Sequence, residues 1–373
     1  MRIHEPLKSF TLHGNSFLYQ DVLEGNIDLS DKSEFEIETF SIIKKWLSAQ
    51  KNFLLKTSGS TGKPKIINFS KEKIKKSASR TIKRFHLNPG QTVLICLNTT
   101  LVAGLMMLVR AIEGNLNLII ESPAANPLAN IDEGRYIDFC AMTPYQAETI
   151  LNDTPSKFAN INTILIGGAA LNPSLERRFH NVQSNIYHSY SMTETLTHVA
   201  IRKVNGIKNS NIYQALQGVS FSQDSRGCLI IYDQTLEIDA LITNDIVHLV
   251  NNTSFKWIGR CDNVINTGGI KIHIEGVEEE IYEILGDLGL QRSFCLLSIP
   301  DQKLTNKLVL LIEESDIKID TNFLLLELKR KLPKYHEPKT LIKVPELILT
   351  KSGKIDRKRN TEQYLHEYHR LRK

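Results

Sequence analysis

The sequence predicts a mixed α/β fold, and three observations predict it. Short apolar strands alternate with helices through the middle of the chain, from residue 92 to residue 166. A chain of 373 residues is too long for one small core and indicates two or three domains. The composition, 41% hydrophobic and 23% charged, is that of an ordinary globular protein. We therefore expect a large N-terminal domain, with a smaller α/β unit over 262–373.

The first predicted elements lie in the N-terminal quarter. Apolar residues at helical spacing predict a helix within 34–50. The apolar run 53–55 predicts a strand, and 66–69 predicts a return strand. Ser70 is placed to cap the N-terminus of a helix that runs to about His86.

The predicted helix 70–86 has an apolar stripe and a basic face. The stripe is Ile74, Ala78, Ile82 and Phe85, and the basic residues are Lys71, Lys73, Lys75, Lys76, Lys83 and Arg84. A basic face can bind nucleic acid, but neither an aromatic platform nor a recognised reader motif accompanies it. We interpret it as a solvated face and expect no nucleic-acid partner. The net charge of +5 is mild and fits an anionic ligand.

Alternating strands and helices follow. Strands are predicted at 92–97, 116–121, 138–142 and 161–166. The run 101–112 predicts a buried helix that is short and contains Arg110, so we expect no membrane span. Thr143-Pro144 begins another helix, because proline suits the first turn. The C-terminal unit is predicted to hold a helix at 275–285, strands at 294–299 and 308–312, and a helix at 321–332.

Cysteine usage and the N-terminus favour a cytoplasmic protein. The five cysteines are scattered, with no C-x-x-C pair, so we expect reduced and mostly buried thiols. The first residues show no signal-peptide pattern.

The segment 57–65 has the composition of a phosphate-binding loop. Glycines let backbone N–H groups approach phosphate oxygens, hydroxyls add donors and lysines add charge. It is not a Walker A loop, since only two residues separate Gly59 from Gly62 and Pro64 follows Lys63. The alternative is a polar surface loop. Its candidate ligands are Thr57, Ser58, Gly59, Ser60, Thr61, Gly62, Lys63 and Lys65.

Further motifs follow in order. Gly167-Gly168-Ala169-Ala170 ends the predicted strand 161–166 and leaves room for a ligand ring, although a tight turn explains it equally well. Ser191 to Glu194 fits a helix capping box, which is a structural alternative for this segment. The remaining motifs are Asp245, Gly259-Arg260-Cys261-Asp262, Gly268-Gly269 and Ser352-Gly353-Lys354.

In this order and at these separations, the motifs resemble those of the adenylate-forming superfamily, which contains acyl-CoA synthetases, adenylation domains of peptide synthetases and luciferases. The resemblance covers the chain from about residue 53 onward. It implies an N-terminal domain over 1–260 that binds ATP and the acid. It also implies a mobile C-terminal domain over 262–373, which carries Lys354 and turns about a hinge near Asp262.

The resemblance also assigns roles for a reaction in which a carboxylate attacks the α-phosphate of ATP. It implies that 57–65 hold the β- and γ-phosphates and that Asp245 and Arg260 bind the ribose. Lys354 bridges the attacking carboxylate and the α-phosphate. Thr193 contacts the α-phosphate and Glu194 carries Mg²⁺, a hard cation that prefers oxygen ligands. The adenine slot and its neighbours are Gly168, Ala169, Ala170, Tyr190, Ser191 and Met192.

In the second half-reaction the resemblance implies a thiol acceptor, usually coenzyme A. Gly268 and Gly269 are then expected to face the site, because glycines suit a pantetheine arm close to the backbone. A plain hairpin turn is the alternative. His198, one helical turn from Glu194, is a candidate for the acyl side, although a histidine near a carboxylate is more often structural.

Four runs resemble, in particular, the ligases that convert o-succinylbenzoate to its CoA thioester in menaquinone biosynthesis. They are 102–111, 141–146, 192–195 and 262–269. We therefore expect a carboxylic acid, ATP and CoA as partners, and a homodimer stays open. The alternatives are another aryl- or acyl-CoA ligase, an enzyme that loads a carrier protein, and a non-catalytic nucleotide-binding protein.

Three positions depart from common relatives. Leu101 stands where a histidine is common, Ser191 where many relatives have glycine, and Asn244 where many have glycine. The chain is also shorter than most relatives, before residue 57.

Overall fold

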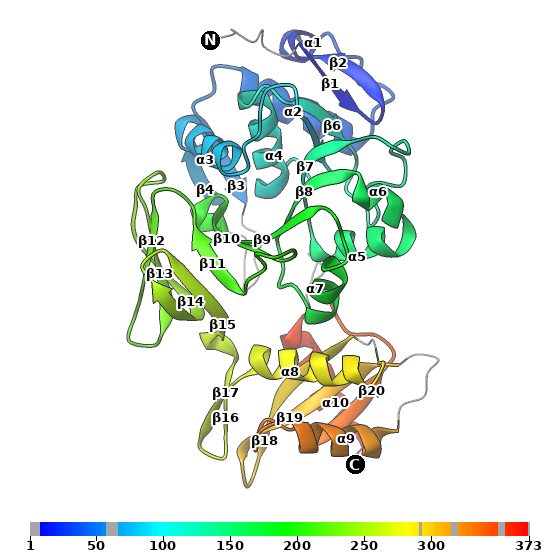
Figure 1. The fold of residues 1–373 in the computed structure, drawn as a ribbon, viewed down its shortest axis with the longest axis vertical. Coiled ribbons are helices and arrows are strands. Elements are labelled where there is room, and N and C mark those ends of the chain that lie inside the picture. The colour runs from blue at the N-terminus through cyan, green and yellow to red at the C-terminus, as the bar shows by residue number, and fades with distance from the viewer. Residues whose placement is uncertain (1–7, 57–65, 291–292, 315–319, 350–354, 372–373) are drawn as a thin grey trace.

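A computed structural model describes residues 8–56, 66–290, 293–314, 320–349 and 355–371 (Figure 1). The predicted phosphate loop, 57–65, and Lys354 lie outside the described residues. Both helices and strands are present throughout, so the predicted mixed α/β class is confirmed.

The described residues form four sheets, of which the largest has 13 strands in the order β12-β13-β14-β15-β11-β10-β9-β8-β7-β5-β6-β1-β2. The segment from β9 to β6 is parallel, and the segment from β9 to β12 is antiparallel. The fold therefore changes from parallel to antiparallel pairing at β9, Asn185–Ser191, the strand that carries Tyr190.

The parallel part is buried on both faces. Along β5 and the residue after it, Val93 and Ile95 belong to one core cluster and Leu94 and Cys96 to another, because successive side chains point to opposite faces. Helices α3 and α4 cover one face, and α5, α6 and α7 cover the other (Figure 1). The strands are β5 Thr92–Ile95, β6 Asn117–Ile120, β7 Ile137–Met142 and β8 Ile161–Ile166. The helices are α3 Lys71–Arg84, α4 Val102–Glu113, α5 Pro144–Asp153, α6 Pro155–Ala159 and α7 Pro173–Phe179.

Local sequence explains where these helices begin. The hydroxyl of Ser70 accepts a hydrogen bond from the Lys73 backbone N–H at 3.2 Å, which caps α3 as predicted. Thr143 and Gln146 form a reciprocal capping box at the start of α5, with Pro144 in the first turn. Every helix and strand predicted within 66–166 is present, with ends within a few residues of the expected ones.

The antiparallel part was not predicted from the sequence. Its central strand pair, β14 and β15, places Asp245 directly opposite Arg260. The strands are β10 His198–Lys203, β11 Ile212–Ala215, β12 Val219–Gln223, β13 Cys228–Asp233, β14 Ile238–Asn251 and β15 Ser254–Arg260.

The N-terminal segment closes the far edge of the sheet. β1, Ser9–Leu12, pairs in parallel with β6, and β2, Asn15–Leu18, forms the outer edge. Helix α1, Tyr19–Glu24, precedes α2, Glu34–Leu47, which is the helix expected within 34–50. A separate hairpin, β3 Asn52–Lys56 with β4 Ile66–Ser70, flanks the predicted phosphate loop.

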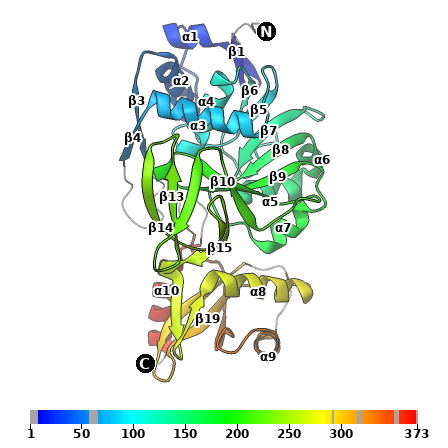
Figure 2. The same ribbon diagram turned by 60° about the vertical axis from the view of Figure 1, so that its left-hand side comes forward.

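Residues beyond 262 pack around cores of their own. Two buried clusters there contain residues 265 and above only. In both views this unit lies at the opposite end of the molecule from β1 and β2 (Figures 1 and 2). Its elements are β16 Val264–Thr267, β17 Ile270–His273, α8 Ile274–Asp287, β18 Phe294–Asp301, β19 Thr305–Glu313, α9 Thr321–Lys331, β20 Thr340–Val344 and α10 Arg357–Leu371.

Among the described residues, no helix combines the length and apolar character needed to span a bilayer. Four of the five cysteines are buried and Cys261 is half-buried, so the expectation of mostly buried free thiols is confirmed.

Candidate active site

The end of β9 meets β14 through a buried contact between Tyr190 and Asp245. The Tyr190 hydroxyl donates a hydrogen bond to Oδ2 of Asp245 at 2.6 Å. Burial raises the pKa of Tyr190 well above its usual value, and the Asp245 charge raises it further, so the phenol stays protonated as the donor. The Tyr190 ring meets Phe255 edge-to-face at 5.1 Å. Two residues predicted to bind adenine and ribose are thus in direct contact.

The second oxygen of Asp245 faces two donors from β15. Trp257 Nε1 lies 3.4 Å from Oδ1, and Arg260 lies 3.6 Å from the same atom. Because β14 and β15 pair Asp245 with Arg260, the sheet register fixes this arrangement. Arg260 also contacts Asp262 at 2.6 Å. Burial acts to lower the pKa of Arg260, but the hydrogen bond to Asp262 and the charges of Asp245 and Asp262 together outweigh it and raise the pKa, so Arg260 stays a cation.

The predicted hinge residue is held by neighbours on both sides. Asp262 lies in the short 3₁₀ turn Cys261–Asn263 and accepts a hydrogen bond from Asn244 at 3.0 Å as well as from Arg260. Asn263 in turn donates to Glu275 on α8 at 2.5 Å. This turn therefore joins the ribose-side residues to the first helix of the C-terminal unit.

The turn 167–170 lies beside β9, as the site prediction requires. An added Cβ at Gly167 would lie 2.5 Å from the Ser189 hydroxyl, and Gly168 has φ of +84°. Ser189 donates to the Ile166 carbonyl at 3.1 Å. The carbonyl of Ala169 lies 3.0 Å from His188 Nε2. Glycine is thus required both for close approach and for the backbone conformation.

The segment after Tyr190 forms a short 3₁₀ turn, Thr193–Thr195, rather than the capping box considered for Ser191 and Glu194. The hydroxyl of Thr195 instead bonds to the backbone of Met192, as donor to its carbonyl at 2.9 Å and as acceptor at 3.3 Å. Leu196 has φ of +60° and is buried, so the chain turns sharply here. Among the described residues, Glu194 is exposed and makes no hydrogen bond or ion pair, which leaves its carboxylate accessible.

His198 does not lie one helical turn from Glu194 as expected, because the 3₁₀ turn ends at Thr195 and His198 begins strand β10. It lies in a buried cationic cluster, which we call the arginine cluster: Arg80, Arg110, Thr197 and His198. Arg110 donates to the Thr197 hydroxyl at 2.8 Å, and that hydroxyl lies 3.1 Å from His198 Nδ1. Arg80 makes a double contact with Asp233, at 2.8 and 2.9 Å. Thr197 stands three residues after Glu194, and its carbonyl accepts a hydrogen bond from Thr195 at 2.8 Å, so the chain runs from the Thr193–Thr195 turn directly into the cluster.

The arginine cluster carries more positive than negative charge. Within the described residues Arg110 has no carboxylate partner, and Arg80 Nε, Arg80 Nη2 and Arg110 Nε are buried without hydrogen-bond partners. Burial, and then Arg80, lowers the pKa of Arg110 to about 9. Burial, followed by the charges of Arg110, Arg80 and Arg84, lowers the pKa of His198 well below its usual value, so His198 is neutral.

Gly268 and Gly269 do not face Asp245 in this conformation. They form the turn between β16 and β17, and both views show this hairpin pointing away from the large sheet (Figures 1 and 2). The Gly268 N–H donates to the Leu304 carbonyl at 2.8 Å, so the turn packs on its own unit.

Sequence reasoning missed several residues of this region. Arg110 is a single charge within an apolar helix. That pattern argues against a membrane span, and it could also have indicated a buried functional cation. Trp257 lies two residues before Gly259, and His188 lies two residues before Tyr190, so both are close in sequence to predicted site residues. Arg80 lay hidden in a basic helix, and its buried position depends on the partner Asp233, 153 residues away.

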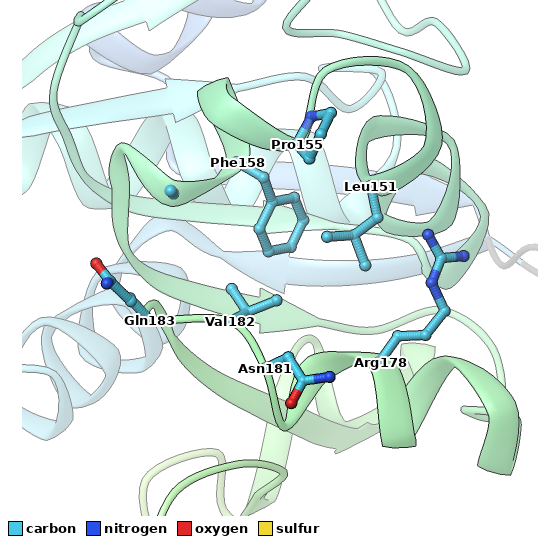
Figure 3. Close-up of a pocket in the computed structure, with 8 residues that line it drawn as sticks. Leu151, Pro155, Phe158, Arg178, Asn181, Val182 and Gln183 are labelled. Carbon is cyan, nitrogen blue, oxygen red and sulfur yellow. The ribbon is translucent and has the colours of Figure 1, made fainter.

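Two surface pockets lie away from Tyr190 and Asp245. One, of about 450 Å³, has an apolar floor in which Leu151, Phe158 and Val182 converge (Figure 3). It contains none of the predicted site residues. The other, of about 730 Å³, separates α3 from the turns at 217–218 and 234–235 and reaches Arg80. Polar and basic residues of α3 line it, so part of the basic face borders a groove.

Comparison with known proteins gives the family. A protein-family model described as "AMP-binding enzyme" matches residues 32–220 of this chain. A Dyadobacter fermentans protein described as acyl-CoA synthetase (AMP-forming)/AMP-acid ligase II-like is 35% identical in sequence. Its structure covers 91% of this chain and 97% of its own, with a TM-score of 0.60.

Two further proteins carry the name of one substrate. A 2-succinylbenzoate–CoA ligase of Listeria monocytogenes is 21% identical over 366 residues, 93% of this chain and 77% of its own. The structure of Bacillus subtilis O-succinylbenzoate coenzyme A synthetase, in complex with ATP and magnesium ion, is 17% identical. The structural alignment covers 83% of this chain and 69% of that protein, with a TM-score of 0.69.

The fold and the matched region define an adenylate-forming enzyme. The chain belongs to the AMP-binding enzyme family. The family predicted from the sequence is therefore confirmed, while the roles of individual site residues stay predictions.

Proposed function

We propose that this chain activates a carboxylic acid with ATP and transfers the acyl group to coenzyme A, and that the acid is o-succinylbenzoate. The observation that carries the nucleotide half is the meeting of Tyr190, Asp245 and Arg260 at one end of β9. A buried carboxylate with hydrogen-bonding capacity left on both oxygens suits the two hydroxyls of a ribose. The names of two relatives support the acid.

In the first half-reaction a carboxylate oxygen attacks the α-phosphorus of ATP. The bond from that phosphorus to the oxygen bridging to the β-phosphate breaks, and pyrophosphate leaves with the electron pair. Asp245 and Arg260 hold the ribose, and Tyr190 lies at the adenine. The loop 57–65 and Lys354 would neutralise charge that develops on the phosphates, an effect strongest in the transition state.

Glu194 suits a magnesium ion bound together with ATP. Its carboxylate is a hard oxygen ligand, exposed and free of competing partners among the described residues. When bound, magnesium would neutralise phosphate charge. A single protein carboxylate is enough, because Mg²⁺ usually takes its other ligands from substrate phosphates and water.

The arginine cluster supports an acid with a second anionic group. Burying an unpaired cation is costly, and a protein keeps one where an anion compensates it. Arg110 contacts Thr197, three residues along the chain from Glu194, and we place the acyl part of the adenylate on this side of the turn. We assign the ring carboxylate of o-succinylbenzoate to Arg110, with Thr197 and His198 as neutral neighbours. A fatty acid would leave this charge buried and uncompensated.

In the second half-reaction the thiol sulfur of coenzyme A attacks the acyl carbonyl carbon, and AMP leaves with its phosphate oxygen. The turn Gly268–Gly269 would have to move toward the site for this step, since it now packs against Leu304. Rotation about Asp262 would bring it there and carry Lys354 away.

The test compares o-succinylbenzoate with 4-oxo-4-phenylbutanoate, which differs only in lacking the ring carboxylate. With ATP, Mg²⁺ and CoA, we expect kcat/KM to be about 10- to 150-fold higher for o-succinylbenzoate, the range for one charged hydrogen-bonded contact. Acyl-CoA and AMP are measured together. Equal values for the two acids, or a preference for a medium-chain fatty acid, would overturn the assignment. Pyrophosphate and acyl-adenylate without CoA thioester would indicate that the acceptor is another thiol, such as that of a carrier protein.

A further inference from the structure

His188 connects three elements that meet at the candidate adenine slot. It lies on β9, two residues before Tyr190, and is buried. Its Nε2 atom lies 3.0 Å from the Ala169 carbonyl oxygen, in the turn after β8. Its Nδ1 atom lies 2.6 Å from the Tyr213 hydroxyl on β11. One ring therefore joins the two sides of the slot to the antiparallel part of the sheet.

The chemistry of these partners fixes which ring nitrogen carries the proton. A backbone carbonyl can only accept, so Nε2 must carry the hydrogen and donate to Ala169. In a neutral ring Nδ1 then has a lone pair, and it accepts from the Tyr213 hydroxyl. Burial, and next the charge of Arg202, lowers the pKa of His188 to about 4, so the neutral form is present near pH 7.

Tyr213 is itself held in place. Its ring stacks on Phe255 at 5.3 Å with an interplanar angle of 16°, and the Arg202 guanidinium lies 5.7 Å from the ring centre. Arg202 makes a double contact with Glu176 on α7, at 2.6 and 2.7 Å. Helix α7 follows the turn 167–170 in the chain. The network therefore links both ends of the connection between β8 and α7 to the sheet. The turn 167–170 contacts His188 on β9, and α7 contacts Arg202 on β10.

We propose that His188 is a positioning residue for ATP, which holds the turn 167–170 at a fixed distance from Tyr190 through its Nε2–H, while the Tyr213 hydroxyl holds the ring by donating to Nδ1. This inference rests on the proposed nucleotide site, although it is independent of which acid is used. Gly168 and Ala169 define one wall of the slot and Tyr190 the other, so the width for the adenine ring depends on the His188–Ala169 hydrogen bond. The side chain itself acts through the backbone.

Nucleotide binding tests the proposal without any acid. Affinity for ATP with Mg²⁺ is measured by calorimetry for the full chain and for three variants. His188→Phe keeps a planar ring but removes both hydrogen bonds, and we expect about a tenfold weaker affinity, the effect of losing about 1.4 kcal/mol. His188→Gln supplies one donor and one acceptor and should restore part of the loss. His248→Gln, at an exposed position on β14, is the matched control and should change nothing.

Two further readouts separate positioning from a general structural role. In steady-state assays His188→Phe should raise KM for ATP while kcat and KM for the accepted acid change less than twofold. Nitrogen-15 spectra should show one histidine, absent in His188→Gln, with a protonated Nε2, a bare Nδ1 and no titration above pH 5. Tyr213→Phe removes the donor to Nδ1 and should weaken ATP binding, while the tautomer stays the same because the Ala169 carbonyl still requires a proton on Nε2.

Unchanged ATP affinity in a folded His188→Phe protein would overturn the proposal, as would a protonated Nδ1 in the native chain. Equal loss of ATP and acid parameters would also overturn it, because that pattern means general disruption. Failure of the o-succinylbenzoate assignment shows instead in the acid comparison, with ATP binding and its dependence on His188 intact.

Discussion

The Tyr190 hydroxyl donates to Oδ2 of Asp245 at 2.6 Å, across 55 residues of sequence. The other oxygen, Oδ1, faces Trp257 and Arg260. Each carboxylate oxygen can accept two hydrogen bonds, so Asp245 can keep these contacts and still accept from ribose. Two roles are therefore proposed for the Tyr190 side chain: its ring lies beside adenine, and its hydroxyl donates to Asp245. A substitution can remove the second role alone.

Tyr190→Phe keeps the ring and removes the donor. We expect KM for ATP to rise about fivefold, the effect of one hydrogen bond of about 1 kcal/mol. Asp245→Ala removes the proposed ribose acceptor and should raise KM for ATP about 100-fold, for about 3 kcal/mol. Pyrophosphate exchange measures both. Tyr145→Phe, at an exposed tyrosine, is the control. A larger effect for Tyr190→Phe than for Asp245→Ala would contradict the ribose assignment.

The parallel half of the fold could be predicted because its signals are local. An apolar run indicates an element, and a nearby residue marks its start, as Ser70 does for α3 and Thr143-Pro144 for α5. Each such signal spans only a few residues. The antiparallel half depends on pairing between distant strands, such as Asp245 opposite Arg260, which no short window contains. The candidate site follows the same rule. Motifs identified Tyr190, Asp245 and Arg260. Arg80 and His188 could not be identified in this way, because their roles depend on partners that lie far away in the sequence.

Glu194→Gln keeps the shape of the side chain and removes the charge proposed for Mg²⁺. We expect the rate of adenylation to fall at least 100-fold at 1 mM-scale Mg²⁺ (about 3 kcal/mol for a lost charged ligand) and to recover partly at about tenfold higher Mg²⁺. The unfolding transition should not change, because Glu194 has no partner within the described residues. Near-normal pyrophosphate release at low Mg²⁺ would leave Glu194 without a role in metal binding.

Arg110→Met replaces the buried, unpaired cation with an apolar chain of similar length. We expect the free energy of unfolding to stay the same or to increase, because no buried carboxylate loses its partner. The preference for o-succinylbenzoate over 4-oxo-4-phenylbutanoate should disappear, since both acids then lack a cation. The two acids and two proteins form a double-mutant cycle whose coupling energy is the contact itself. Arg135→Met, on an exposed loop, is the matched control.

The two buried histidines predict a loss of stability in mild acid. In the folded protein the pKa of His188 is about 4 and that of His198 lies well below its usual value. Around His188 lie Tyr213, Arg202 and Glu176, and around His198 lie Arg110, Arg80 and Arg84.

An unfolded histidine takes up a proton below about pH 6.5, whereas these folded histidines do not. Stability from each is therefore complete above pH 6.5 and is lost as the pH falls below 6.5, by about 1.4 kcal/mol per pH unit for each histidine, down to about pH 4 for His188. Urea unfolding at pH 7, 6 and 5 measures the slope. His188→Gln should reduce that slope by about one proton, whereas the exposed His248→Gln should not.

The hinge prediction can be separated from the contacts of the hinge residue. Asp262 accepts hydrogen bonds from Arg260 at 2.6 Å and Asn244 at 3.0 Å, so a substitution without a side-chain acceptor removes both. Asp262→Ala removes them and leaves φ free, whereas Asp262→Pro removes them and also fixes φ near −65°. If the backbone at 262 rotates between the two half-reactions, only the proline variant prevents the second arrangement.

We therefore expect Asp262→Ala to retain both half-reactions within about tenfold, the scale of two exposed polar contacts. Asp262→Pro should form the acyl-adenylate at a rate close to that of Asp262→Ala, because the adenylating arrangement does not require the rotation. Its conversion of pre-made acyl-adenylate to acyl-CoA should be at least 100-fold slower than in Asp262→Ala. Single-turnover assays of each step, on proteins with matching unfolding curves, give this comparison. If proline and alanine slow the two steps by the same factors, residue 262 is a contact point and the rotation takes place elsewhere in the chain.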